Sequence, residues 1–126
     1  MAGLTLDTGA LLGFERSDRR TLTHLKHAQL IGLELTVPTP VVAEAWRGGA
    51  RSARISRLLD ACVIEPLLLD LARLAGEAMA AVRGSTVVDA IVMASAARRG
   101  DRVLTADFDD LERLRSYFPA VRLLKV

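Results

Sequence analysis

The sequence is poor in the residues that crosslink chains, stack on bases or build fibrous repeats. Its single cysteine, Cys62, cannot form an internal disulfide, and it excludes the Cys-rich cages that hold structural zinc. Aromatic residues make up 4%, which argues against a protein that binds single strands on stacking platforms. Nine glycines and four prolines show no repeat, which excludes collagen-like chains. These absences leave the composition of a globular protein.

Long hydrophobic runs are also missing, although hydrophobic residues make up 51% of the 126 residues and the mean hydropathy is +0.27. The run Leu67-Leu68-Leu69 is interrupted by Asp70, and no stretch has enough uncharged apolar residues to cross a membrane. No basic leader precedes an apolar run at the N-terminus, so we expect no signal peptide. The sequence predicts a single domain over residues 1–126 with a packed core, located in the cytoplasm.

A strong charge of one sign is absent as well. Seventeen basic and fifteen acidic residues give a formal net charge of +2, too small to predict nucleic-acid binding by itself. All the basic residues except Lys26 and Lys125 are arginine, whose planar fork suits phosphate. Codon usage in a GC-rich genome, which also fits the alanine content, explains this bias more simply than a phosphate-bearing partner does.

Strand-like and helix-like patterns alternate along the chain. Strands are predicted at residues 4–6, 33–37, 62–66, 102–105 and 121–124. Helices are predicted at residues 10–14, 19–31, 41–47, 50–61, 70–82, 87–99 and 108–114. Helices of this length between strands imply βαβ crossovers and a sheet that is covered on both faces. The predicted fold class is α/β, a three-layer α/β/α sandwich around a mainly parallel five-stranded sheet.

Capping residues are expected to define several helix ends. Asp18 is the predicted N-cap of the helix at 19–31, and Thr39 is that of the next helix, with Pro40 at its first position. Gly100 is expected to end the helix at 87–99, where the Arg98-Arg99 pair would complement the helix dipole.

Four carboxylates stand where carboxylates are costly. Asp7 directly follows the first predicted strand, and Asp107 follows the fourth by one residue. In open α/β sheets ligands bind beyond the carboxyl ends of the strands, so both acids are expected at that edge. Glu44 and Asp89 each lie in an apolar stretch near the start of a helix. The pattern indicates a shared site rather than four unrelated surface acids.

Such a site needs a cation. An isolated carboxylate in apolar surroundings costs several kcal/mol or has a raised pKa, and several in one pocket also repel each other. Hard oxygen ligands suit Mg²⁺ and Mn²⁺, which would remove both problems. Two such ions about 3.5–4 Å apart can activate water and stabilise a leaving oxygen on phosphate. The acids therefore predict metal-assisted phosphodiester hydrolysis, with the choice between RNA and DNA left open.

Each aspartate also has a purely structural explanation. The segment from Thr86 to Asp89 reads as a capping box. Asp107 is a natural N-cap for the helix that follows, with Asp110 at its third position. Asp7 belongs to an Asp-Thr-Gly sequence that forms turns readily. If caps are all that these acids are, the protein is a non-catalytic binding module, and this is the alternative to an enzyme.

Two further observations bear on that choice. Glu44 is the acid that is hardest to explain as a cap, because its neighbours on both sides are apolar and its only close cation is Arg47. Asp7-Thr8-Gly9 also matches the signature of a homodimeric aspartic protease. That fold is almost entirely β, whereas the second half of this chain has long amphipathic helical patterns, so the protease is disfavoured.

The acids and their surroundings resemble a PIN domain, specifically the VapC-type toxin of a VapBC toxin–antitoxin pair. The resemblance extends over essentially the whole chain and rests on four segments, Leu4–Leu12, Val41–Glu44, Val88–Ala97 and Val103–Asp107. It implies an endoribonuclease that uses Mg²⁺, or Mn²⁺ in its place. The implied catalytic and metal-binding residues are Asp7, Glu44, Asp89 and Asp107.

The resemblance also assigns supporting residues. Thr8 and Thr105 resemble the hydroxyl residues that orient the carboxylates, and Asp109 resembles an auxiliary acid. The family often continues its last acid as Asp-x-Asp-Phe, whereas here Phe108 directly follows Asp107, which puts the role of Asp109 in question.

Partners follow from the same resemblance. It implies a homodimer that acts on RNA and is silenced by a VapB-like antitoxin, whose C-terminal segment fills a groove beside the active site. Leu11, Leu12 and Phe14 would either line that groove or pack against the sheet. Trp46 is expected at a subunit interface or in the core.

A run of arginines follows Glu44. Arg51, Arg54 and Arg57 share one helix face, after Arg47. The face is either simply solvated or a strip that follows RNA phosphates. The functional interpretation assigns RNA binding to Arg47, Arg51 and Arg54.

Overall fold

The computed structural model describes residues 2–126, which form one parallel sheet between two layers of helices. All neighbouring strands are parallel, and the strand order is β3-β2-β1-β4-β5. The strands are β1 Leu4–Leu6, β2 Leu35–Pro38, β3 Val63–Glu65, β4 Arg102–Thr105 and β5 Leu123–Lys125. The predicted fold class is confirmed.

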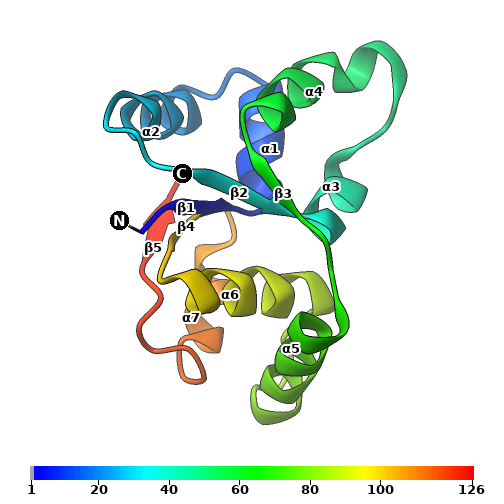
Figure 1. Cartoon of the computed structure of the whole chain (residues 1–126), viewed down its shortest axis with the longest axis vertical. Helices are drawn as coiled ribbons and strands as arrows, with labels where there is room; N and C mark the ends of the chain where they lie inside the picture. Colours follow the sequence, from blue (N-terminus) through cyan, green and yellow to red (C-terminus); the bar gives the residue numbers. More distant parts are fainter. Residues whose placement is uncertain (1) are drawn as a thin grey trace.

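The helices divide between the two faces of the sheet (Figure 1). One face carries α1 Thr8–Glu15, α2 Arg19–Leu30, α3 Thr39–Ala45, the 3-10 helix η1 Gly49–Ser52 and α4 Ala53–Asp60. The other carries α5 Leu69–Ala81, α6 Val87–Arg99 and α7 Phe108–Leu114. Because all neighbouring strands are parallel, the carboxyl ends of the strands lie at the same edge of the sheet.

The core lies on both sides of β1 and β4, the central strands. All three residues of β1 are buried, and α6 is buried from Ala90 to Ala96 between the sheet and its neighbouring helices. At the edge of the sheet, β3 leaves Val63 and Ile64 exposed. No helix of the described chain is long and apolar enough to span a membrane.

Three helix ends follow the prediction. The Asp18 carboxylate accepts a hydrogen bond from the Thr21 N–H at 3.0 Å, and the Thr86 hydroxyl accepts one from the Asp89 N–H at 3.3 Å. Gly100 ends α6 with φ of 73°, a left-handed conformation that glycine adopts without a steric penalty.

The predicted cap at Thr39 is wrong. The N-cap position is held by Pro38, whose fixed φ already sets the extended conformation there, and helix α3 begins at Thr39 itself. The Thr39 hydroxyl instead accepts a hydrogen bond from the N–H of Leu67, 28 residues further along the chain. A long-range contact therefore replaces the expected local one.

Some element boundaries also differ. Strand β2 begins at Leu35 because the Leu33 N–H still closes the end of α2 by donating to the Ala28 carbonyl. The helix predicted at 50–61 is divided into η1 and α4. The division coincides with Ser52, whose buried hydroxyl accepts the N–H groups of Arg47 and Gly48.

The arginine pair at the end of α6 does more than complement a dipole. The Arg99 guanidinium donates hydrogen bonds to Glu65 at 2.8 Å, to the Thr5 hydroxyl at 2.8 Å and to Asp101 at 3.0 Å. These bonds join α6 to β1, to β3 and to the residue before β4. Arg99 is thus a half-buried residue that links three elements of the fold, a role that dipole reasoning did not predict.

Candidate active site

Asp7 occupies the turn from β1 into α1 at the carboxyl edge of the sheet. It is the N-cap of α1: its Oδ1 accepts the N–H of Ala10 at 2.9 Å. Its side chain is buried, with the residue 2% exposed, yet Oδ2 has no hydrogen-bond partner among the described residues. The cap explains one oxygen of this carboxylate and leaves the other without a structural role.

Burial raises the pKa of Asp7 from 3.8 to about 6. The Thr105 side chain and the Ala10 N–H oppose the shift, whereas the charges of Asp107 and Asp89 add to it. Two of the other predicted site acids, Asp107 and Asp89, are therefore close enough to Asp7 to raise its pKa.

Gly9 permits this close approach. A Cβ at this position would collide with the Cβ of Ala106, the residue before Asp107. The absence of a side chain at Gly9 lets the start of α1 contact the end of β4. Contact between these two segments brings Asp7 and Asp107 to the same place.

Asp89 lies in the first turn of α6, half-buried, and its pKa is raised chiefly by burial. The Thr86 hydroxyl opposes the shift, and the charges of Asp107, Asp110 and Glu44 add to it. Together with the coupling of Asp7 to Asp89 and Asp107, this links all four acids named from the sequence into one electrostatic cluster.

Glu44 and Asp107 line an open cleft of about 490 Å³ at this edge. The Thr8 hydroxyl donates to Glu44 Oε1 at 2.6 Å, and the Asp107 N–H donates to the Thr105 hydroxyl at 2.8 Å. Asp107 stands at the N-cap position of α7, but its side chain makes no capping hydrogen bond within residues 2–126. The cleft is lined by Thr8, Gly9, Leu12, Arg16, Ala43, Glu44, Arg47, Ala106 and Asp107.

Arg16 is a cleft residue that sequence reasoning missed. Thr8, Leu12 and Arg16 are spaced by four residues and all line the cleft. Spacing of four places side chains on one helix face, so Thr8 together with this rule would have identified Arg16.

A second hollow of about 300 Å³ adjoins Asp107 and adds two more residues that were missed. Lys125, at the carboxyl end of β5, lies over the Phe108 ring at 5.9 Å from its centre. Asp110 pairs with Arg113 at 2.9 Å while its charge also acts on Asp89. Asp109, the predicted auxiliary acid, lines this hollow as well. The strand-end rule that identified Asp7 would also have identified Lys125.

The predicted arginine strip is divided by the structure. Arg47 lines the cleft beside Glu44. Arg51 is on η1, and the Arg54 guanidinium lies over the Phe14 ring, 5.5 Å from its centre, so neither lines the cleft. Arg57 lines a different groove, next to α2.

The acid cluster fits a divalent cation in its chemistry. It offers hard oxygen donors, a buried oxygen on Asp7 without a hydrogen bond in the described chain, and pKa values raised at Asp7 and Asp89 chiefly by burial. Within residues 2–126, no three acidic, histidine or cysteine side chains stand close enough to hold an ion without adjusting their positions.

Solved structures of low sequence identity share this fold. A chain of VapBC2 from Rickettsia felis, bound to a promoter DNA fragment, superposes with a TM-score of 0.78 at 12% identity, covering 98% of each chain. DNA-bound VapBC from Salmonella typhimurium gives a TM-score of 0.73 at 14% identity, covering 99% of this chain and 98% of that one. FitAcB from Neisseria gonorrhoeae gives 0.67 at 15% identity, covering 97% and 96%.

Comparison with curated protein sequences gives no match. The PIN domain family, by contrast, matches the sequence over residues 4–116, a range that contains all four site acids. The chain belongs to the PIN domain family.

Proposed function

We propose that the chain is a divalent-metal-dependent endoribonuclease of the VapC type, the toxin of a type II toxin–antitoxin pair. PIN domains are generally nucleases, and the proteins that share this fold include VapBC complexes. The observation that carries the proposal is the buried Asp7, whose Oδ2 forms no hydrogen bond within residues 2–126 and whose charge is coupled to Asp107 and Asp89.

The ligands of Mg²⁺, or of Mn²⁺ in its place, would be Asp7, Glu44, Asp89 and Asp107. Bound there, the ion would neutralise the acid cluster and lower the pKa of a bound water molecule. The chain itself holds the acids in place: Thr8 orients Glu44, and Thr105 fixes the backbone of Asp107. The Thr8 hydroxyl donates to Oε1 of Glu44, which leaves Oε2 free to contact the ion or a water molecule on it, as Oδ2 of Asp7 is also free to do.

Cations around the acid cluster would hold the RNA backbone. Arg16 and Arg47 line the cleft, and Lys125 stands at the neighbouring hollow. Arg51 and Arg54 lie further along the chain and would contact phosphates more distant from the scissile bond. Asp109 remains a proposed auxiliary acid at the edge of the site.

The VapB-like antitoxin, expected beside the active site, would also bind an apolar groove of about 430 Å³ between α2 and α4, which includes Phe14 but none of the four acids. Its floor is apolar and its rim carries Lys26 and Arg57, a surface that suits an amphipathic segment with acidic residues. The groove is lined by Phe14, Leu22, Leu25, Lys26, Gln29, Leu35, Arg57, Leu58 and Ala61.

The proposed homodimer has a different surface. Strand β3 and the segment after it expose Val63, Ile64 and the three leucines 67–69. Trp46, 41% exposed, favours the interface interpretation over the core one. Contiguous apolar exposure of this kind is typical of surfaces that another chain covers.

RNA cleavage by the purified chain tests the proposed function. We expect cleavage with Mn²⁺ or Mg²⁺, none with EDTA, and none from Asp89→Asn, whose far-ultraviolet circular dichroism should match that of the wild type. Asp70→Asn, on an exposed residue of α5, is the control and should cleave normally. Equal cleavage by Asp89→Asn and wild type would overturn the assignment in favour of the binding module.

A further inference from the structure

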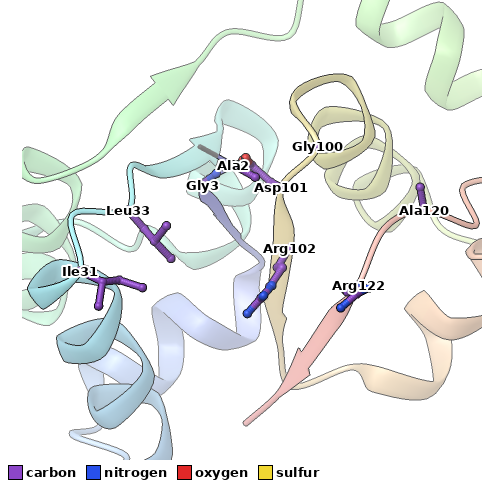
Figure 2. A pocket seen from close by; sticks show the side chains of 9 residues that line it. All are labelled: Ala2, Gly3, Ile31, Leu33, Gly100, Asp101, Arg102, Ala120 and Arg122. Atoms are coloured by element: carbon purple, nitrogen blue, oxygen red, sulfur yellow. Dashed lines mark hydrogen bonds between the residues drawn. The ribbon is translucent and has the colours of Figure 1, made fainter.

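A separate hollow lies at the amino edge of the sheet and contains none of the four site acids. Figure 2 shows the side chains that line it. Its volume is about 380 Å³, within the range of small-molecule sites. It is bounded by the start of β1, the end of α2, the end of α6 and the segment that leads into β5. The lining residues are Ala2, Gly3, Ile31, Leu33, Gly100, Asp101, Arg102, Ala120 and Arg122.

Two arginines stand side by side in this hollow. Val103 pairs with Leu123 in the register of β4 and β5, so Arg102 and Arg122 are neighbours one position earlier. The Val103 N–H donates to the Arg122 carbonyl at 2.9 Å, which holds the two strands together at this point. Register neighbours on parallel strands point to the same face and are about 4.8 Å apart. The two positive residues therefore stand next to each other, Arg102 at the start of β4 and Arg122 just before β5, at the edge of the hollow.

Neither guanidinium has a partner within residues 2–126. The salt bridges of the described chain use Arg98, Arg99, Arg113 and Arg115, and no hydrogen bond from the side chain of Arg102 or Arg122 is formed. Both residues are exposed. No acidic side chain of residues 2–126 pairs with either guanidinium, so both are available to an anionic ligand.

Asp101, the one acid that lines the hollow, pairs with Arg99 instead. Its Oδ1 accepts the Gly3 N–H at 2.8 Å, and its Oδ2 accepts the Thr5 hydroxyl at 2.9 Å and the Arg99 guanidinium at 3.0 Å. The residue is 4% exposed. Because Arg99 already compensates its charge, Asp101 neither neutralises the arginine pair nor presents a free carboxylate to a ligand.

We propose that this hollow binds the phosphate group of a nucleotide. A tetrahedral phosphate has enough oxygens to accept hydrogen bonds from two guanidinium forks at once, whereas the two oxygens of a carboxylate are satisfied by one fork. Ile31, 50% exposed, and Leu33 provide an apolar wall against which a base can pack. This site shares no residue with the acid cluster, and it does not depend on the proposed nuclease activity.

Binding measurements without divalent metal test the inference. In EDTA, the wild-type chain is titrated by calorimetry with inorganic phosphate, with AMP and with adenosine, and its melting temperature is measured with each. We expect phosphate and AMP to bind and to raise the melting temperature, AMP more tightly than phosphate, and adenosine to bind at least tenfold more weakly than AMP. Adenosine binding as tightly as AMP, or no binding of phosphate and AMP at millimolar concentration, would overturn the proposal.

Variants locate the site. Arg102→Gln and Arg122→Gln should each weaken AMP binding at least tenfold, with an unchanged or higher melting temperature in the absence of ligand, because repulsion is relieved. Arg73→Gln, on an exposed residue of α5, should leave AMP binding unchanged. Wild-type affinity in both hollow variants would refute the site.

The source of the phosphate is decided by competition. A short RNA with hydroxyl termini has only internal phosphodiesters, so displacement of AMP by this RNA would assign the site to the RNA backbone. If only an RNA of the same sequence with a 5′ phosphate displaces AMP, the site is specific for a terminal phosphate. Either result would support a phosphate site, and failure of both RNAs to compete would assign it to free nucleotides.

Discussion

A buried carboxylate lies at each edge of the parallel sheet, and the two differ in the hydrogen bonds that they accept. At the amino edge, Asp101 receives three hydrogen bonds, one of them from the charged Arg99. At the carboxyl edge, Asp7 is buried to a similar degree, but its Oδ2 forms no hydrogen bond within residues 2–126 and its pKa is raised to about 6. The contrast separates a carboxylate that stabilises the fold from one that is held ready for a ligand.

The largest expected effect is on catalysis at the carboxyl edge. Asp7→Asn should lower RNA cleavage by about a hundredfold or more, since even indirect damage to a metal site costs ten- to a hundredfold. Asparagine caps a helix as well as aspartate does, so the variant removes the charge and keeps the cap. Single-turnover cleavage assays measure the loss. Asp101→Asn is the matched control, and the comparison fails if it loses as much activity per folded molecule as Asp7→Asn.

Stability should change in the opposite direction for the same two substitutions. Asp101→Asn removes one of the two carboxylates that pair with Arg99, leaving Glu65, and should cost about 2 kcal/mol of unfolding free energy. Asp7→Asn should instead stabilise the metal-free protein at pH 7, because it removes a buried unpaired charge. Urea denaturation in EDTA measures both, and destabilisation by both variants would remove the distinction between the two edges.

The pH dependence of stability sharpens the comparison. Between pH 4 and pH 6 the unfolded chain has lost the Asp7 proton while the folded chain retains it. The free energy of unfolding contributed by this group is therefore fully present below pH 4 and falls by about 3 kcal/mol as pH rises to about 6. Denaturation of the metal-free protein across this range measures the fall, and Asp7→Asn should flatten it. An identical profile in the variant would contradict the assignment of the shift to Asp7.

Metal binding should reverse that penalty. Mn²⁺ at a hundred times its dissociation constant should stabilise the wild type by about 2.7 kcal/mol. Mn²⁺ should stabilise Asp7→Asn and Asp89→Asn far less. It should stabilise Asp101→Asn as much as the wild type, although the metal-free Asp101→Asn protein is less stable. Thermal melts with and without Mn²⁺ measure this. The binding-module alternative predicts no rise in melting temperature for any of these proteins.

The smallest expected effects concern RNA affinity. Lys125→Gln and Arg47→Gln should each weaken RNA binding by a few fold and reduce the salt dependence of affinity by about one ion, as expected for a single phosphate contact. Filter binding in EDTA at several salt concentrations measures both. Arg83→Gln, on an exposed residue before α6, is the control, and an equal effect from it would indicate only a general charge effect.

Local chemistry explains why much of the fold could be predicted. Apolar periodicity predicted the alternation of strands and helices, and the short polar caps Asp18 and Thr86 formed as expected. Thr39 behaved differently because its hydroxyl bonds to a residue that is distant in sequence. Arg99 likewise could not be recognised as a link between elements, because its partners come from separate strands.

The residues of the candidate site also fall into those that local sequence rules predict and those that only tertiary packing brings together. The rule that parallel strands end at one edge predicted Asp7 and Asp107 and, applied to the last strand, would have identified Lys125. No local pattern indicates that Asp110 acts on Asp89, because the two residues are on different helices that only packing brings together.

The sequence by itself determined the α/β alternation, the end of the sheet where the acids gather and the membership in a nuclease-type family, because these depend on periodicity and order along the chain. The tertiary structure alone decided which buried carboxylate is neutralised and which is not. Asp7 and Asp101 both lie next to a strand, and the difference between them is the set of donors that reach each one. That set depends on the distance between groups in space, because hydrogen bonds and unscreened charges act over a few ångströms whatever the separation in sequence.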